Sequence, residues 1–264
     1  MQRTVPDILA RIAGHKREQL ASKRTRRAEW EARAEASVSS RRDFRSALLA
    51  NTPSIIAEIK KASPSRGVLM ENFDPAVIAS TYHRGGAAAL SVLTDEPFFQ
   101  GSLGDLRSAR AAAPMPILRK DFTIDEIDVI ETAAAGADAF LLIAALLTTS
   151  EMRRFREIGA QYGLAALAEV HDGEELRSVL DSGADIIGVN SRDLRTFEVQ
   201  LEISFELAAQ IPASAVRVAE SGIHSASDVA QLQQAGFQAF LVGEHLMKSS
   251  DPAEALRALR GTQA

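Results

Sequence analysis

Short apolar segments recur along the chain from residue 55 onward at a nearly constant interval. Each is apolar over most of its length, which is typical of strands that are buried on both faces of a sheet. Eight such runs occur: IIAEIK (55–60), AALSVL (88–93), PILRK (116–120), AFLLIA (139–144), LAALAEV (164–170), DIIGVN (185–190), VRVAES (216–221) and AFLVG (239–243). Their interval averages about 26 residues, the length of one strand, one helix and two short loops.

The segments between these runs carry start and stop signals of helices. Two pairs place a capping aspartate before a proline at the first helical position, Asp74-Pro75 and Asp251-Pro252. Two further pairs have capping-box spacing, Thr123 with Glu126 and Asp172 with Glu175. Four helices are predicted to end in a glycine-containing turn just before a strand, in GGAAALSVL, AGADAFLLIA, SGADIIGV and AGFQAFLVG.

Eight strand-and-helix units predict parallel strands that are covered by helices, as in a (β/α)8 barrel. The main alternative is a doubly wound open sheet, which usually has fewer units, and no G-x-G-x-x-G motif follows the first strand. The first fifty residues show helical spacing of apolar residues and no strand signal. We therefore predict an α/β fold, a (β/α)8 TIM barrel, as a single domain over residues 1–264. Residues 1–54 form an N-terminal helical extension in this prediction.

Composition narrows the classes of function. Hydrophobic residues make up 46% and charged residues 25% of the 264 residues, which is ordinary for a globular protein. The chain has no cysteine, which excludes disulfides, thiolate nucleophiles and cysteine-based metal sites. The longest apolar run, 139–147, has nine residues, far short of the ~20 that cross a bilayer, and no signal-peptide pattern begins the chain. We expect a cytoplasmic protein without a membrane partner.

Charge is unevenly distributed within the net value of −5. The first fifty residues carry +6 and the remainder −11. The basic run from Lys23 to Arg27 raises the possibility of a nucleic-acid partner, but it has no interleaved aromatic or glycine residues. We interpret it as the solvated face of an amphipathic helix and predict no nucleic-acid binding.

Polar residues stand at the ends of six predicted strands. The carboxyl ends of barrel strands carry the active site in enzymes of this architecture. Buried charges are costly without partners, so a set of them at one rim favours a functional role over chance. The candidates at these ends are Glu58, Lys60 and Ser63; Lys120 and Phe122; Glu169; Asn190 and Arg192; Glu220, Ser221 and Gly222; and Gly243 and Glu244.

The residue types in this set indicate proton transfer and anion binding. Glu58 and Lys60 are two residues apart on one strand, so they share a face and are expected to form an ion pair within the site. Lysines and glutamates at one partly dry mouth suit several proton transfers, and an arginine suits a carboxylate or phosphate. The glycine-containing loops after the last two strands favour a phosphate site beside a short extra helix. The five histidines form no HExxH motif or close cluster, so we predict no metal.

Seven segments together resemble one enzyme family, indole-3-glycerol phosphate synthase. They are AEIKKASPSRG (57–67), SVLTDEPFFQGS (91–102), PILRKDF (116–122), ALAEVH (166–171), IIGVNSRDL (186–194), VAESGI (218–223) and LVGEHLM (241–247). The resemblance covers almost the whole chain, in order and at the family's spacing. It implies conversion of 1-(2-carboxyphenylamino)-1-deoxy-D-ribulose 5-phosphate to indole-3-glycerol phosphate, with loss of carbon dioxide and water. It also implies a step of tryptophan biosynthesis, a phosphorylated small-molecule substrate and no cofactor.

The resemblance further implies roles for individual residues. Lys120 is implied as the general acid and Glu169 as the partner base in dehydration, with Glu58 and Lys60 as supporting catalytic groups. Asn190 is counted among the catalytic residues because it would orient the reacting groups. The substrate-binding set is Ser63, Phe122, Arg192, Glu220, Ser221, Gly222, Gly243 and Glu244, of which Phe122 would form a wall of the aromatic pocket and the last four a phosphate cradle. The N-terminal extension is implied to cap the barrel mouth.

Two positions depart from the family pattern, and alternative functions stay open at this point. Ala62 stands where some members carry lysine, and His245 stands where a small residue is common. One alternative is another phosphate-binding barrel enzyme such as phosphoribosylanthranilate isomerase, whose acid–base pair typically needs a cysteine. Another is a non-catalytic barrel that binds a phosphorylated metabolite. The motifs leave the oligomeric state unknown, and a monomer is favoured.

Overall fold

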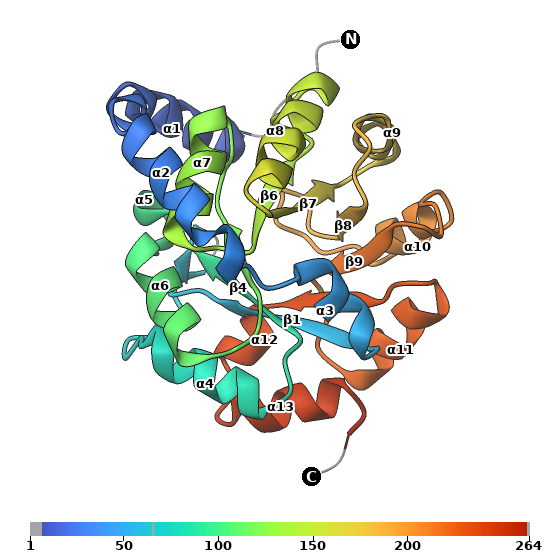
Figure 1. Cartoon of the computed structure of the whole chain (residues 1–264). Helices are drawn as coiled ribbons and strands as arrows, with labels where there is room; N and C mark the ends of the chain where they lie inside the picture. Colours follow the sequence, from blue (N-terminus) through green and yellow to red (C-terminus); the bar gives the residue numbers. More distant parts are fainter. Residues whose placement is uncertain (1–6, 65, 263–264) are drawn as a thin grey trace.

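Eight parallel strands close into a barrel in the computed structural model, which describes residues 7–64 and 66–262. The strand order around the barrel is β1-β10-β9-β8-β7-β6-β5-β4 (Figure 1). Their bounds are β1 Ser54–Ile59, β4 Ala89–Leu93, β5 Ile117–Lys120, β6 Ala139–Ile143, β7 Ala165–Val170, β8 Ile186–Asn190, β9 Val216–Glu220 and β10 Ala239–Val242. All eight apolar runs are strands, so the predicted barrel is confirmed. The short strands β2 (Ala62–Ser63) and β3 (Gly67–Val68) form a separate antiparallel pair.

Alternate residues of each strand face the helices and the barrel interior. On β1, Ile55, Ala57 and Ile59 belong to the larger core between strands and helices, while Ile56 belongs to the cluster that fills the barrel. Glu58 follows Ile56 at a spacing of two and pairs in register with Ser91 of β4. The strand therefore directs Glu58 into the barrel, at the end where β1 reaches the mouth.

Helices cover the outside of the barrel. Their bounds are α4 Pro75–Arg84, α5 Glu96–Phe99, α6 Leu103–Ala112, α7 Glu126–Ala135, α8 Thr149–Gln161, α9 Gly173–Asp181, α10 Glu202–Ala208, α11 Ala226–Gln234, α12 Glu244–Met247 and α13 Pro252–Leu259. Asp74 and Asp251 cap α4 and α13 as predicted. The short helix α12 after β10 is the extra helix that the last loop predicts. None of the helices within the described ranges is both long and apolar enough to cross a bilayer.

The two predicted capping boxes differ from those in the structure. The capping residue of α7 is Asp125, two residues after Thr123, because Asp125 and Asp128 form the reciprocal box instead. Asp172 caps α9 as predicted, but the Glu175 carboxylate accepts the backbone N–H of His171 rather than that of Asp172. An aspartate caps a helix at least as well as threonine, so both residues are suitable caps and the backbone path selects Asp125.

The four predicted glycine turns are all present. Gly86, Gly136, Gly183 and Gly236 have φ values of 84°, 90°, 81° and 98°. A side chain at such a φ meets the following carbonyl, so glycine ends these helices at low cost. Each turn delivers the chain into the next strand from outside the barrel.

The N-terminal extension contains α1 (Asp7–Thr25), α2 (Arg27–Ser37), the short 3-10 turn Val38–Ser40 and α3 (Phe44–Ala50). The extension is helical as predicted, and the first strand begins at Ser54, the last residue that the prediction assigned to it. Among the described helices of the extension, α1 alone contributes residues to the pocket at the barrel mouth. Helix α2 packs along α7 (Figure 1), and Phe44 of α3 lies in one buried cluster with residues at the strand starts, so α3 covers the opposite end.

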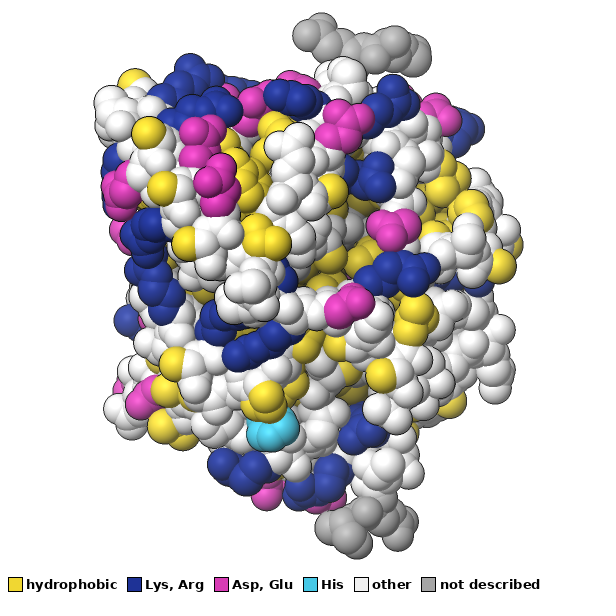
Figure 2. Space-filling view, viewed as in Figure 1, with side chains coloured by type: hydrophobic (Ala, Val, Ile, Leu, Met, Phe, Trp, Pro, Cys, Tyr) yellow, Lys and Arg dark blue, Asp and Glu magenta, His cyan; other side chains and the backbone are white. Residues whose placement is uncertain are grey.

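The basic run at the end of α1 is solvated at its arginines, which are 60%, 52% and 51% exposed at Arg24, Arg26 and Arg27, but not at Lys23. Lys23 Nζ lies 2.7 Å from Asp128 and 2.9 Å from Glu131 of α7, and Arg24 lies 2.6 Å from Asp125. The interpretation of a solvated face is therefore wrong at Lys23, whose side chain is 13% exposed. Lysine and arginine side chains alternate with acidic ones over this part of the surface (Figure 2). The excess positive charge of the extension is matched by acidic residues that follow in sequence.

A second set of ion pairs holds α1 at the mouth. Lys16 Nζ lies 3.1 Å from Asp95 and 2.6 Å from Asp121, and all three side chains are buried. Burial opposes ionisation of Asp121, but Arg119 and Lys16 outweigh it and hold the pKa of Asp121 below its usual range. Asp95 caps α5 through the backbone N–H of Phe98, and the one cation within ion-pair distance among the described residues is Lys16.

Replacing Lys16 with methionine is expected to destabilise the protein by about 3 kcal/mol, because it leaves buried Asp95 without a cation. Urea unfolding monitored by circular dichroism measures this change. Lys248→Met is the matched control, since the Lys248 side chain is 52% exposed and surface pairs contribute less than about 1 kcal/mol. Equal losses in the two variants would contradict a special role for the buried pair.

Candidate active site

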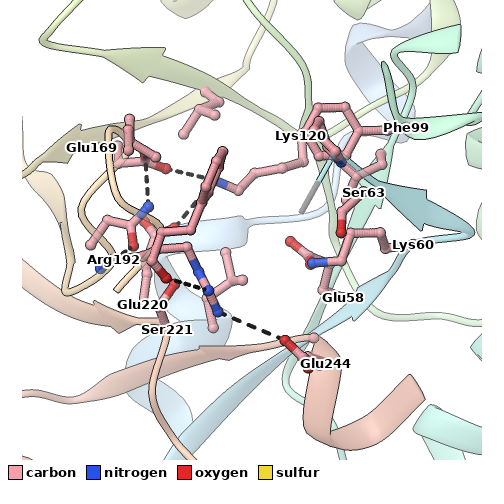
Figure 3. Close-up of a pocket in the computed structure, with 18 of the residues that line it drawn as sticks. Glu58, Lys60, Ser63, Phe99, Lys120, Glu169, Arg192, Glu220, Ser221 and Glu244 are labelled. Atoms are coloured by element: carbon pink, nitrogen blue, oxygen red, sulfur yellow. Dashed lines mark hydrogen bonds and ion pairs between the residues drawn. The ribbon is translucent and has the colours of Figure 1, made fainter. Parts of the chain in front are cut away.

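A pocket of about 200 Å³ opens at the carboxyl ends of the strands. The structure places all thirteen sequence-predicted site residues around it, from six strands and the loops that follow them. Most of them are labelled in Figure 3. They are Glu58, Lys60, Ser63, Lys120, Phe122, Glu169, Asn190, Arg192, Glu220, Ser221, Gly222, Gly243 and Glu244. The convergence follows from the fold, because parallel strands in a barrel all end at one rim.

Lys120 lies at the centre of the site between two buried carboxylates. Its Nζ is 2.6 Å from Glu169 Oε2 and 3.2 Å from Glu220 Oε2, and these carboxylates are 4% and 2% exposed. Burial disfavours the charged form of Lys120, but Glu169 and Glu220 outweigh burial and raise the pKa of Lys120. Lys120 is therefore protonated at neutral pH and can donate a proton.

The two carboxylates beside Lys120 differ in their proton affinity. Burial works against the charge on Glu169, but Lys120 and His171 outweigh it and hold the pKa of Glu169 below its usual range. Burial, together with the charge of Glu169, raises the pKa of Glu220 above its usual range. Glu220 Oε1 also has no hydrogen-bond partner within the described part of the chain. The site thus contains an ionised base, Glu169, and a second carboxyl that holds a proton more readily.

Glu58 and Lys60 form the expected ion pair, at 2.5 Å, and both line the pocket. The pair therefore lies within the site rather than apart from it. Asn190 donates from Nδ2 to Glu169 Oε1 at 3.2 Å and accepts the backbone N–H of Arg192 at 3.0 Å. Asn190 thereby connects the base to the loop that carries Arg192.

Cationic groups lie at the rim toward α12. Arg192 lies 3.8 Å from Glu244 (Figure 3). Glu244 also contacts Lys248 at 2.7 Å and Arg66 at 3.3 Å. The bond from Lys248 lowers the pKa of Glu244. Ser221 and Gly222 both have positive φ, at 68° and 76°. This unusual pair of conformations turns the chain sharply at the end of β9.

Apolar side chains close the other side of the pocket. The ring centroids of Phe122 and Phe99 are 5.9 Å apart. Three residues of α1 also line the cavity, Ile8, Leu9 and Ile12. An aromatic ring fits between such walls. Sequence analysis missed these α1 residues individually, since their spacing predicts a buried helix face but not what covers it. Phe99 stands in the SVLTDEPFFQGS segment but lies beyond the end of β4 at Leu93, so its position relative to the strand does not indicate a site residue.

Comparison with known proteins gives the family. A family model described as indole-3-glycerol phosphate synthase matches residues 9–259. A curated protein of that name from Azoarcus sp. is 48% identical over 262 residues, which cover 97% of this chain and 99% of the relative. Another, from Koribacter versatilis, is 49% identical over 223 residues, covering 83% of this chain and 86% of the relative. The chain belongs to the indole-3-glycerol phosphate synthase family.

Two solved structures resemble this indole-3-glycerol phosphate synthase family member in fold alone. Thiamine phosphate pyrophosphorylase from Pyrococcus furiosus has a TM-score of 0.60 and 18% identity, covering 81% of this chain and 96% of that one. A chain described as "Native KDPGal structure" has a TM-score of 0.55 and 15% identity, covering 78% and 94%. Both support the barrel architecture.

Gly188, inside the barrel on β8, leaves room for Glu220 in this family member. A Cβ at this position would overlap Glu220 Oε1 and lie 3.2 Å from its Cδ. Gly188→Ala is expected to displace the Glu220 carboxylate from Lys120 and to lower kcat by about 10²-fold. Steady-state kinetics on the family substrate measure the loss.

Gly14→Ala is the matched control for Gly188→Ala. A Cβ at Gly14 on α1 meets nothing within 4 Å, and alanine favours helix by up to about 1 kcal/mol. Its activity should equal that of the wild type. If Gly188→Ala also retained full kcat, the position of Glu220 would not matter for turnover.

Proposed function

We propose that this protein is an indole-3-glycerol phosphate synthase of tryptophan biosynthesis. It converts 1-(2-carboxyphenylamino)-1-deoxy-D-ribulose 5-phosphate to indole-3-glycerol phosphate, carbon dioxide and water. The observation that carries the proposal is a protonated lysine held between two buried carboxylates in a pocket with an aromatic wall. Ring closure followed by dehydration needs an acid and a base at one place, together with a slot for the anilino ring.

The pocket offers a place for each part of the substrate. Phe122 and the α1 residues suit the aromatic ring, and Lys60 with Arg192 suits its carboxylate. The loops at Ser221 and Gly243 suit the phosphate, because backbone N–H groups at such turns bind anions. The ketone and hydroxyl groups of the ribulose chain then lie between these ends, where Lys120 and Glu169 face one another.

Proton transfers follow from the charges in the site. Lys120 donates to the ketone oxygen as the aromatic carbon bearing the carboxylate bonds to the ketone carbon, and loss of carbon dioxide restores the aromatic ring. Lys120 then takes a proton back from solvent and gives it to the new hydroxyl, which leaves as water. Glu169, held ionised, takes the proton from the methylene carbon beside the nitrogen, which completes the indole double bond. Glu58 supports Lys60, and Glu220 supports Lys120.

Turnover of the carboxyphenylamino-deoxyribulose phosphate, followed by indole fluorescence, tests the proposed function. Product should form without an added metal ion or cofactor. One molecule of carbon dioxide should be released for each molecule of indole-3-glycerol phosphate. Failure to form product from folded protein would remove the assignment. A barrel that only binds the phosphorylated compound would show binding in calorimetry without any fluorescence change.

We further propose that the chain works as a monomer in the cytoplasm, with residues 1–264 acting as one domain. The single-domain proposal is supported by α1 and α3, which contact the two ends of the barrel. The cytoplasmic proposal is supported by the absence of cysteine from the sequence. Light scattering of the purified protein measures its molar mass in solution and so tests the proposed monomeric state.

A further inference from the structure

A buried histidine lies behind the base of the site. His171 follows the last residue of β7, its side chain is 14% exposed, and it is not among the described residues that line the pocket. Its Nε2 lies 3.3 Å from Glu169 Oε1, and its Nδ1 lies 3.0 Å from Glu175 Oε2. Glu175 Oε2 also accepts the backbone N–H of His171 at 2.8 Å. The imidazole is therefore fixed between two carboxylates, one catalytic and one at the start of α9.

The surroundings of His171 favour its charged form. Neutral imidazole has one N–H, so one of the two carboxylates would face a ring lone pair. Burial opposes the charge, but the nearby carboxylates of Glu169 and Glu175 outweigh it and raise the pKa of His171 to about 10. The contact to Glu169 has the length of an ion pair without the alignment of a hydrogen bond, so its effect is chiefly electrostatic.

Glu169 is thus held by a different cation at each oxygen. Lys120 of β5 contacts Oε2, and His171 lies beside Oε1. Two other groups face Glu169. Asn190 of β8 is a neutral donor, and Glu220 of β9 is a carboxyl whose negative charge would repel that of Glu169. Glu58 of β1 acts on Lys120 from farther away. When Lys120 donates its proton during turnover, His171 is the cation that remains beside Glu169.

We propose that His171, anchored by Glu175, is a positioning residue that keeps Glu169 ionised and oriented as the base of dehydration. This inference rests on the proposed function, since it concerns the step in which Glu169 accepts a proton. His171 does not touch the substrate and does not exchange its own proton. Its contribution is a fixed positive charge that Lys120 cannot provide after donating.

The dependence of kcat/KM on pH tests this role. His171→Gln retains an amide donor of similar reach without the charge, so the pKa of Glu169 should rise and the acidic limb should move up by about one pH unit. The rate should then be about tenfold lower on that limb and return to within about threefold of the wild type near pH 9. Glu175→Gln should give a smaller shift in the same direction, because it loosens His171 without removing it.

His83→Gln is the matched control, since His83 is exposed on α4 and is not among the residues that line the pocket. Its profile should coincide with that of the wild type, and ionisation of the substrate phosphate affects all four proteins equally. Coincident acidic limbs for the wild type and His171→Gln would overturn the proposal. A loss that is the same at every pH would also overturn it, because a purely structural role predicts that pattern.

Histidine ring signals in NMR titrations give a second readout that does not need turnover. The signal absent from His171→Gln identifies His171, which should stay protonated to pH 9 in the wild type and titrate lower in Glu175→Gln. Titration of His171 near its ordinary value of about 6.5 would overturn the proposal. If the wild type turned over no substrate, the proposed function would fail, while this titration would still show whether His171 is a fixed cation beside Glu169.

Discussion

Replacing Lys120 with alanine is expected to lower kcat by about 10⁴-fold, the upper range for loss of a general acid. Lys120 is the group that both donates the proton and holds Glu169 ionised through a 2.6 Å contact. Without it, Glu169 and Glu220 face each other in a dry pocket, and one of them takes up a proton. The variant therefore loses the acid directly and the base indirectly. Single-turnover indole fluorescence measures both effects together.

Lys120→Arg separates catalysis from charge. Arginine keeps the positive charge between the carboxylates but does not release a proton at neutral pH, so it should preserve the fold while restoring little turnover. If Lys120 were only a structural ion-pair partner, the arginine variant would approach wild-type kcat. That result would remove the general-acid role and leave Lys60 as the remaining lysine of the site.

Stability of the alanine variant should depend on pH with a definite sign. Without Lys120, Glu169 and Glu220 face each other in the dry site, and the carboxyl that takes up a proton has a folded-state pKa above its unfolded-state pKa. A carboxyl of this kind lowers the free energy of unfolding as the pH rises above its unfolded-state pKa, because it ionises more readily in the unfolded chain than in the folded one. The deficit in melting temperature relative to the wild type should thus be larger at pH 8 than at pH 5. Differential scanning calorimetry at the two pH values measures it, and a constant deficit would contradict the stated pairing.

The barrel and its mouth could be predicted because both depend on local, periodic signals. Strands buried on both faces read as apolar runs, and the left-handed glycine turns before them repeat at Gly86, Gly136, Gly183 and Gly236. Parallel strands of a barrel all end at one rim. The positions of the strands alone therefore predict that Lys120, Glu169 and Glu220 lie close together. The assignment of roles among them came from the family resemblance, because residue type alone does not separate acid from base.

Contacts between distant segments could not be predicted in this way. Lys16 reaches Asp95 and Asp121, and Lys23 reaches Asp128, across about a hundred residues of sequence. A basic run reads the same whether it faces water or an acidic helix, so its interpretation as solvated was wrong where α7 covers it. The caps at α7 show a local version of this limit, since Thr123 and Asp125 both offer a cap and only the backbone path decides between them.

Replacing Glu169 with glutamine is expected to lower indole formation by about 10³-fold, because it removes the base of dehydration while leaving a side chain of equal size. Lys120 keeps its contact to Glu220 at 3.2 Å, so the acid remains charged and in place. Ring closure with loss of carbon dioxide should therefore continue more readily than dehydration. The variant is expected to accumulate the ring-closed, hydroxylated intermediate.

Carboxylate-labelled substrate distinguishes the two halves of the reaction in a single turnover. Glu169→Gln should release labelled carbon dioxide well before indole fluorescence appears, whereas Lys120→Ala should slow both signals. The comparison is controlled internally, because each variant removes one partner of the same 2.6 Å ion pair. Equal delays of carbon dioxide and indole in Glu169→Gln would mean that Glu169 acts before decarboxylation. Its role would then be to hold Lys120 during ring closure rather than to accept the proton of dehydration.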